Sequence, residues 1–201
     1  DFDQQKPALL PGFTLHHVGM INAARNPVLF WKVLHDLCNS EPGFSDDLHI
    51  QFTGRADFHV IESLRAHGLD VHLRIVDQVS HREAIRAMQA SPVLLLLLND
   101  AQDIAGRIPA KLFEYMASGR PVLSIGDTSG DAAAIIKESA CGSTASMHSE
   151  EEIRNVVLDM YRRWKQNDLP AAKNINKYSR KEAAKQFAEI LDSIQSTADK
   201  T

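Results

Sequence analysis

Apolar and polar residues alternate along this chain in blocks that predict strands and helices in turn. Continuous apolar runs at Val93–Leu98 and Val122–Ile125 are typical of strands that are buried on both faces of a parallel sheet. The remaining strand candidates are Phe13–Val18, Leu48–Thr53, Val71–Val76 and a weaker one at Gly142–Ala145.

Between these strands, apolar residues recur at the spacing of amphipathic helices, for example from Phe30 to Cys38 and from Ile153 to Trp164. Capping-box pairs predict three helix starts: Ser80 with Glu83, Ser149 with Glu152, and Ser179 with Glu182. The last helix carries its apolar residues on one face: Ala183, Phe187, Ile190, Leu191 and Ile194. Strands that alternate with helices predict an α/β fold, a doubly wound parallel sheet of about six strands with helices on both faces.

Composition narrows the class of protein. The 201 residues suit one domain, and 44% hydrophobic with 24% charged residues exclude a disordered or fibrous chain. The net charge of −4 argues against nucleic-acid binding. The two cysteines, Cys38 and Cys141, form no disulfide framework and favour a reducing, cytoplasmic compartment. The longest apolar run is too short to span a bilayer.

Ligands of open parallel sheets bind beyond the carboxyl ends of the strands, so the loops there are the first candidates for a site. Gly19, Gly54 and Gly126 each follow a predicted strand. A glycine at such a position either forms a tight turn or lets a ligand approach the backbone closely. Arg25 precedes a predicted helix start and could face an anion there or remain solvated. The Gly-x-Gly-x-x-Gly fingerprint of dinucleotide-binding folds is absent, and Arg55 is a weaker candidate for the same role as Arg25.

The segment Gly106–Pro121 is the most informative part of the chain. It predicts a helix that begins at Pro109 and ends at Gly119. Lys111 falls in the first turn, where the helix dipole disfavours a cation unless an anion lies nearby. Glu114 lies three residues on, so a plain surface ion pair between Lys111 and Glu114 is the simpler reading.

Metal and nucleophile chemistry find no support in the sequence. The nine histidines form no metal-ligand spacing, and we interpret them as structural or surface residues. His16 and His17 are neighbours in a predicted strand and should therefore point to opposite faces of the sheet. No Gly-x-Ser-x-Gly elbow and no cysteine–histidine pattern occurs.

The run Ile-Pro-Ala-Lys-Leu-Phe-Glu-Tyr-Met-Ala-Ser-Gly-Arg-Pro-Val, residues 108–122, resembles a family pattern. The pattern is Pro-x-Lys-Leu-x-Glu-Tyr-x-Ala-x-Gly-x-Pro-Val, found in the C-terminal half of retaining family-four glycosyltransferases of the GT-B fold. Other segments match in the same order: Gly19 with Arg25-Asn26-Pro27, Ile50–Gly54, Val79-Ser80-His81 with Glu83, and Gly130-Asp131. The resemblance runs from about Gly12 to Ser143.

The resemblance implies roles for individual residues. The implied contacts are Gly19, Arg25, Asn26 and Lys111 to the donor diphosphate, Glu114 to the ribose, Gln78 and Val79 to the base, and Gly106, Arg107, Ile108 and Asp103 to the sugar. One departure concerns the first of two motif glutamates, because its position is taken by Gly106, which has no side chain. Asp103, Asp100 or a backbone N–H is then left to contact the sugar. No catalytic residue, metal or cofactor is implied.

The resemblance also implies a division of labour. Residues 1–11 resemble the end of an interdomain linker, 12–201 a Rossmann-like donor-binding domain, and 179–196 a C-terminal helix that leans on an N-terminal, acceptor-binding half. We expect a nucleotide-diphosphate sugar as donor and an acceptor saccharide or lipid-linked saccharide. We expect the segment alone to be inactive, and the whole enzyme to build bacterial surface polysaccharide or glycolipid, in the cytoplasm or peripherally at the inner membrane face.

Other functions stay open on the residues alone. A nucleotide-sugar epimerase has the same fold but needs acidic groups that move a sugar proton, and Gly106 removes the obvious one. A non-enzymatic α/β binding module of the flavodoxin or receiver type is the other alternative. Asp77 lies near the place of a receiver's aspartate, but no acidic cluster follows the first strand.

Overall fold

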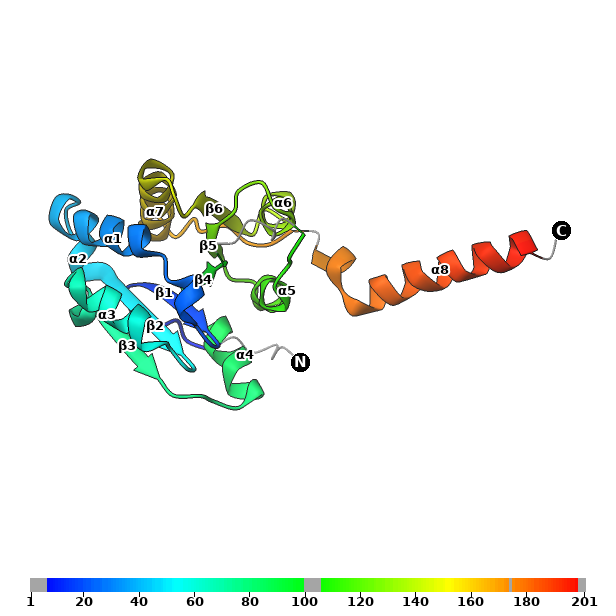
Figure 1. Cartoon of the computed structure of the whole chain (residues 1–201), viewed down its shortest axis with the longest axis horizontal. Helices are drawn as coiled ribbons and strands as arrows, with labels where there is room; N and C mark the ends of the chain where they lie inside the picture. Colours follow the sequence, from blue (N-terminus) through cyan, green and yellow to red (C-terminus); the bar gives the residue numbers. More distant parts are fainter. Residues whose placement is uncertain (1–6, 100–105, 174, 199–201) are drawn as a thin grey trace.

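A parallel sheet forms the centre of the computed structural model, which describes residues 7–99, 106–173 and 175–198, with side chains up to residue 191. The sheet has six strands in the order β3-β2-β1-β4-β5-β6, and every neighbouring pair is parallel (Figure 1). The strands are β1 (Phe13–Val18), β2 (Leu48–Thr53), β3 (Leu73–Val76), β4 (Val93–Leu97), β5 (Val122–Gly126) and β6 (Gly142–Ser146). The predicted doubly wound sheet is confirmed.

Helices cover both faces of the sheet, as the alternating pattern predicts. One apolar cluster joins the sheet to α1 (Val28–Ser40), α3 (Phe58–Ala66) and α7 (Glu150–Lys165). A second cluster on the opposite face joins it to α4 (His81–Gln89), α5 (Ala110–Ser118) and α6 (Asp131–Glu138). The shorter elements and the last helix are η1 (Ala23–Arg25), α2 (Phe44–Asp47), η2 (Asp70–His72), η3 (Ile175–Tyr178) and α8 (Arg180–Ala198).

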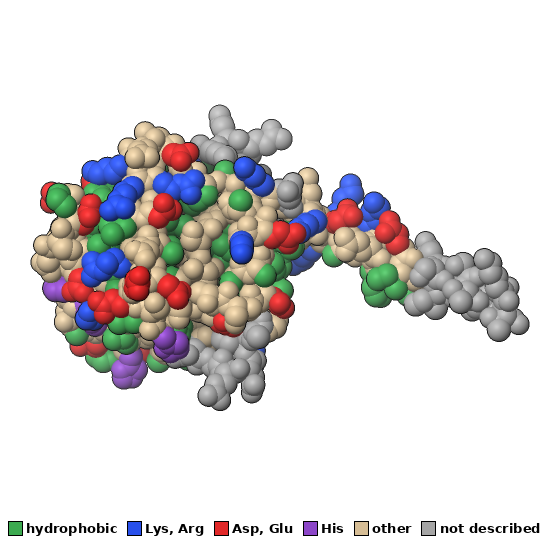
Figure 2. Space-filling view, turned by 90° about the horizontal axis from the view of Figure 1, so that it is seen from above, with side chains coloured by type: hydrophobic (Ala, Val, Ile, Leu, Met, Phe, Trp, Pro, Cys, Tyr) green, Lys and Arg blue, Asp and Glu red, His purple; other side chains and the backbone are tan. Residues whose placement is uncertain are grey.

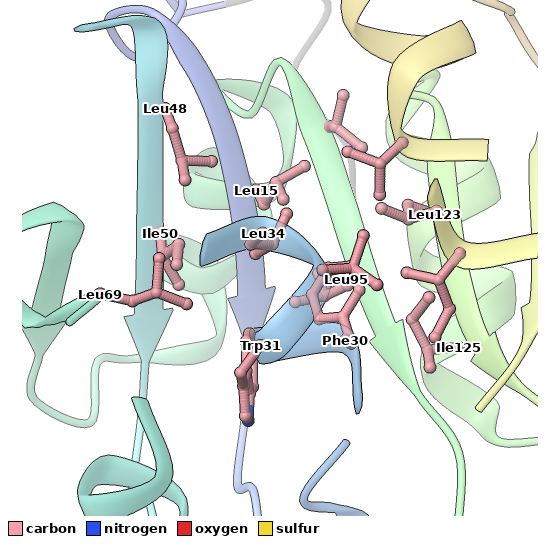
Figure 3. Close-up of a cluster of buried hydrophobic side chains, with 14 of the residues drawn as sticks. Leu15, Phe30, Trp31, Leu34, Leu48, Ile50, Leu69, Leu95, Leu123 and Ile125 are labelled. Carbon is pink, nitrogen blue, oxygen red and sulfur yellow. The ribbon is translucent and has the colours of Figure 1, made fainter. Parts of the chain in front are cut away.

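The apolar run of β4 is explained by burial on both faces. Leu95 packs into the cluster of α1, α3 and α7, together with Leu15 and Phe30 (Figure 3). Leu94 and Leu96 pack into the cluster of α4, α5 and α6. Because a central strand has no solvent face, the sequence shows no alternation here.

The strand β1 carries two buried histidines on opposite faces. His16 is fully buried, and its imidazole contacts the hydroxyls of Ser91 (2.7 Å) and Thr53 (2.8 Å). The Ser91 hydroxyl donates to the carbonyl of Ala87, so His16 Nδ1–H donates to Ser91 and Nε2 accepts from Thr53. This network ties β1 to β2 and to the turn before β4.

The structure departs from the sequence interpretation at some boundaries. β3 starts at Leu73, two residues later than predicted, because His72 and Val71 belong to η2 and Val71 is 80% exposed. The segment 166–173, which follows α7, packs back on the domain, with Lys173 N donating to Ser139 O (2.7 Å). The connection from α1 to β2, for which the sequence pattern predicts no element, contains the short helix α2.

The last helix extends away from the body of the molecule (Figure 1). Its predicted apolar face is exposed in the residues whose side chains are described: Phe187 is 63% exposed and Ile190 56%. Ile194 lies outside the described side chains. Figure 2 shows Lys and Arg interspersed with Asp and Glu over the face in view, in keeping with the small net charge.

Ser80 starts α4 with a complete capping box, in which its hydroxyl accepts from Glu83 N and the Glu83 carboxylate accepts from Ser80 N. We expect Ser80→Ala to lower the free energy of unfolding by about 1 kcal/mol, because an orphan N–H of a packed helix loses its acceptor. Denaturant unfolding measures this. The matched control is Ser179→Ala, which removes the equivalent acceptor from Glu182 N at the exposed helix α8. Equal losses in the two variants would contradict the assignment.

Candidate functional site

The chain reverses its winding direction between β1 and β4, the central neighbours of the sheet. Such a switch point is where open α/β sheets bind ligands, beyond the carboxyl ends of the strands. The ladder between these strands, all of whose residues are described, pairs Leu15 with Val93 and ends at His16–Leu94. The ladder ends at that pair, and residues of the loops that follow β1 and β4, among them Gly19, Arg25 and Asn99, line cavities beyond it.

Two cavities lie at this edge of the sheet. The first, here called the β1–β3 cavity, has a volume of about 490 Å³, and its neighbour has about 440 Å³. Gly19, Arg55, Gln78 and Val79 are among the residues that line the β1–β3 cavity. The second, the β4–β5 cavity, is lined by residues that follow β4 and β5 together with the loop after β1. Its lining includes Arg25, Asn99, Gly106, Arg107, Ile108 and Asp127.

Gly19 and Gly54 shape the floor between β1 and β2. Both have a φ of +117°, which a residue with a side chain rarely adopts. A Cβ on Gly54 would lie 2.9 Å from Gly19 O, and a Cβ on Gly19 would collide with Lys111 Nζ. Close backbone packing and a positive φ therefore require Gly54, and the positive φ favours glycine at Gly19, where the tip of Lys111 fills the space of a side chain.

Lys111 reaches that space from the first turn of α5. Its Nζ lies 3.1 Å from His17 Nε2, and His17 Nδ1 lies 3.0 Å from Leu95 O. Burial, with the positive charge of Arg25 next in importance, lowers the pKa of Lys111 to about 8. Burial, followed by the charge of Lys111, lowers the pKa of His17 to about 3.

The simple surface ion pair between Lys111 and Glu114 is not what the structure has. Within the described residues, no hydrogen bond or ion pair joins the two side chains, although Glu114 acts on Lys111 through its charge. Lys111 bonds to His17 instead, 94 positions away in the sequence. Glu114 is half-buried on the same helix and keeps its carboxylate available.

Tyr115 fixes α5 against the end of β1. Its ring is fully buried, and its hydroxyl accepts from Val18 N at 2.9 Å. The same hydroxyl lies 3.4 Å from Val18 O, to which it donates. Because Val18 directly precedes Gly19, this contact sets the distance between the start of α5 and the glycine loop.

Arg25 and Asn26, both predicted to contact a diphosphate, have different surroundings. Arg25 is half-buried, and its Nε donates to Asn99 Oδ1 at 2.6 Å at the rim of the β4–β5 cavity. Asn26 Oδ1 accepts from the indole of Trp31 (2.8 Å), and its Nδ2 donates to His59 O (3.5 Å). Asn26 thus anchors the start of α1, and its side chain is engaged within the protein.

The remaining predicted residues divide between the cavities. Gln78 and Val79, predicted to meet a base, line the β1–β3 cavity, while Gly106, Arg107 and Ile108 line the other. Among the described residues, a Cβ on Gly106 would meet no atom within 4 Å, so packing against them does not demand a glycine there. The candidates Asp100 and Asp103 lie outside the described residues.

Sequence reasoning missed Asn99, Asp127 and His17. Asp127 directly follows β5, and Asn99 lies two residues after the end of β4. Polar residues at the carboxyl ends of buried strands mark a ligand edge, and this pattern could have found both. The Asp127 carboxylate accepts from Ser129 N (2.8 Å) and Ser129 Oγ (2.7 Å), which lowers its pKa. The sequence gave no such indication for His17, because an inward-pointing histidine in a strand is ordinarily interpreted as a structural core residue.

The described part of the chain contains no group of three or more His, Cys, Asp or Glu side chains able to hold a metal ion. Over the same residues, no helix is both long and apolar enough to cross a membrane.

The comparisons with known proteins rest on structure, because no protein-family model and no curated protein matches the sequence. The glycosyltransferase WaaG of lipopolysaccharide biosynthesis is 18% identical, with a TM-score of 0.52 over 77% of this chain and 41% of that one. HepE of Anabaena, solved with UDP-glucose, is 15% identical, with a TM-score of 0.59 over 90% of this chain and 49% of that one.

A third neighbour is the C-terminal domain of the group 1 glycosyltransferase LpcC from Francisella tularensis. It is 16% identical, with a TM-score of 0.54 over 79% of this chain and 84% of that domain. The chain therefore spans less than half of the length of WaaG and HepE but most of an isolated C-terminal domain. At these identities the likeness concerns architecture, and this chain has the Rossmann-like α/β fold of GT-B glycosyltransferase domains.

Proposed function

We propose that this chain is the nucleotide-sugar donor-binding domain, the C-terminal half, of a retaining glycosyltransferase. The observation that carries the proposal is the Lys111 ammonium held beside Gly19 at the switch point of the sheet. Its two neighbours line one cavity each: Gly19 the β1–β3 cavity and Arg25 the β4–β5 cavity. A diphosphate that joins a nucleoside to a sugar needs a cationic centre with room on both sides.

Charge supports a doubly anionic ligand at this place. Lys111 and Arg25 are like charges close enough for Arg25 to lower the pKa of Lys111, and the helix dipole adds to the mismatch. A diphosphate would offset the two positive charges and the positive end of the helix dipole. The departing nucleoside diphosphate gains negative charge during transfer, so the same cations would stabilise the transition state.

The positions of the two cavities suggest where the base and the sugar of the ligand bind. The base would lie in the β1–β3 cavity near the backbone of Gln78 and Val79, and the sugar in the β4–β5 cavity near Gly106, Arg107 and Ile108. Glu114, one turn beyond Lys111 and without a hydrogen bond in the described residues, is the proposed ribose ligand. Asn26 is a less suitable phosphate ligand than its sequence position implies, because Trp31 holds its oxygen.

The rest of the proposal concerns the whole enzyme. Transfer requires an acceptor oriented at the anomeric carbon, which we assign to a separate acceptor-binding half. We therefore expect this segment alone to bind donor without transferring it efficiently. Construction of bacterial polysaccharide or glycolipid at the cytoplasmic side of the inner membrane, without metal or organic cofactor, completes the proposal.

A thermal-shift screen of the chain with UDP-glucose, GDP-mannose, ADP-glucose and dTDP-glucose tests the proposed function. A ligand at 100 times its Kd stabilises a fold by about 2.7 kcal/mol. We expect one nucleotide to raise Tm clearly above the others, and UDP-glucose is the first candidate because HepE was solved with it. If none of the four shifts Tm at millimolar concentration, the proposed function is wrong.

The variant Glu114→Gln tests whether Glu114 binds the ribose or is only a carboxylate at the surface. We expect it to weaken binding of the best nucleotide by about 1.5–3 kcal/mol, since a charged acceptor is lost, while Tm of the free chain stays within a degree or two. Calorimetric titration measures the affinity. Glu62→Gln on α3, whose carboxylate pairs only with the exposed Arg65 among described residues, is the control and should bind as the parent does. Equal affinities of all three proteins would remove Glu114 from the site.

A further inference from the structure

His17 is a buried polar side chain that joins three parts of the fold. It lies on β1 and is 1% exposed. Its ring contacts the carbonyl of Leu95 on β4 and the ammonium of Lys111 on α5. It stands one residue beyond His16–Leu94, the last pair of the β1–β4 ladder, so the imidazole bridges the two strands just beyond the ladder.

The ring makes two hydrogen bonds of normal geometry, to Leu95 and Lys111, and the Met20 backbone also acts on it and raises its pKa. The two hydrogen bonds assign the proton to one ring nitrogen. A backbone carbonyl can only accept, so His17 Nδ1 is the protonated nitrogen that donates to Leu95 O at 3.0 Å. In a neutral ring Nε2 is then an acceptor, and Lys111 Nζ at 3.1 Å donates to it. Complete burial keeps the ring neutral, since the pKa of His17 falls to about 3.

We propose that His17 is a positioning residue for Lys111: its neutral imidazole accepts a hydrogen bond from the ammonium and holds it beside Gly19, where the ligand's diphosphate binds. The placement of the diphosphate rests on the proposed function, whereas the hydrogen bond itself does not. The proposal explains why a histidine stands at a core position of β1 where an aliphatic side chain would pack more simply.

The other charged groups near the ammonium do not supply this restraint. Arg25, in the loop after β1, repels Lys111, and Glu114, on α5 itself, attracts it along its own helix. A flexible lysine with only these neighbours would be free to swing toward Glu114 or solvent. The acceptor on β1 is the described group that draws the ammonium across the opening, over the glycine.

The experiment compares His17→Leu, which removes the acceptor, with His17→Gln, which offers an amide oxygen at a similar reach. Lys111 is titrated by NMR in the ligand-free chain with isotope-methylated lysines, its resonance assigned from Lys111→Arg. Loss of the acceptor destabilises the charged amine, so His17→Leu should lower the pKa of Lys111 below its parent value of about 8. It should also weaken UDP-glucose binding about tenfold or more, and His17→Gln should recover most of both losses.

His16→Leu is the matched control, because His16 is equally buried on β1 but faces the Ser91 and Thr53 hydroxyls on the other side of the sheet. It should lower stability without moving the pKa of Lys111. An unchanged Lys111 pKa in His17→Leu, or an equal shift in His16→Leu, would overturn the proposal. If the parent chain binds no nucleotide sugar, the proposed function fails, and the Lys111 titration still decides the hydrogen bond.

A second measurement covers the case in which the His17 variants do not fold. Nitrogen-15 NMR of the parent chain should show His17 protonated at Nδ1 and bare at Nε2 from pH 6 to 8. Lys111→Met, which alters a side chain outside the strand core, should shift Nε2 toward the value of a nitrogen without a hydrogen bond. A proton on Nε2 would contradict the inference, and so would an Nε2 chemical shift that is the same in Lys111→Met as in the parent chain.

Discussion

A lysine ammonium withdrawn from water at the switch point of the sheet is the constraint on which the arrangement depends. It needs the space that a side chain on Gly19 would fill, an acceptor from β1, and a helix held at a fixed distance by Tyr115. These requirements fall on different segments of the chain and meet only in the folded protein. The strand order places them together, because β1 and β4 are neighbours although 78 positions separate the contacting residues His17 and Leu95.

The same ammonium works against the stability of the free chain. The pKa of Lys111 is about 8 in the fold and about 10.5 without it, so between these values the unfolded state binds more protons. Stability from this group therefore rises with pH from about 8 to about 10.5, and at neutral pH the charged form is disfavoured by folding. Packing of β4 and its neighbours offsets that loss. A strongly shifted group beside two cavities, in conflict with local helix electrostatics, is typical of a functional site.

Much of the fold could be predicted from the sequence, because burial determines where apolar residues stand along the chain. β4 and β5 are apolar throughout since both faces are covered, and Ser80 and Glu83 mark a helix start by local hydrogen bonds. The start of β3 was harder to predict, because valine is typical of strands, whereas Val71 lies exposed in the short helix η2.

The site was predictable only in part. Lys111, Gly19 and Arg25 stood out by their place at strand or helix ends. The partners that decide their roles are distant in sequence: His17 for Lys111, Asn99 for Arg25. The engagement of Asn26 was not predictable for a related reason, because the indole that donates to its oxygen belongs to Trp31, which has the pattern of an ordinary core residue. Residue type marks a candidate, and tertiary contacts decide what it is free to do.

Proton uptake on binding tests most directly whether the diphosphate meets Lys111. At pH 8 about half of the Lys111 side chains are charged, because the pKa is about 8. A diphosphate that contacts the amine raises this pKa, so binding should take up roughly half a proton. UDP-glucose is titrated calorimetrically at pH 8 and pH 6 in buffers that differ in ionisation enthalpy. The account predicts a buffer-dependent heat at pH 8 that disappears at pH 6 and in Lys111→Arg; binding at pH 8 with the same heat in every buffer would contradict it.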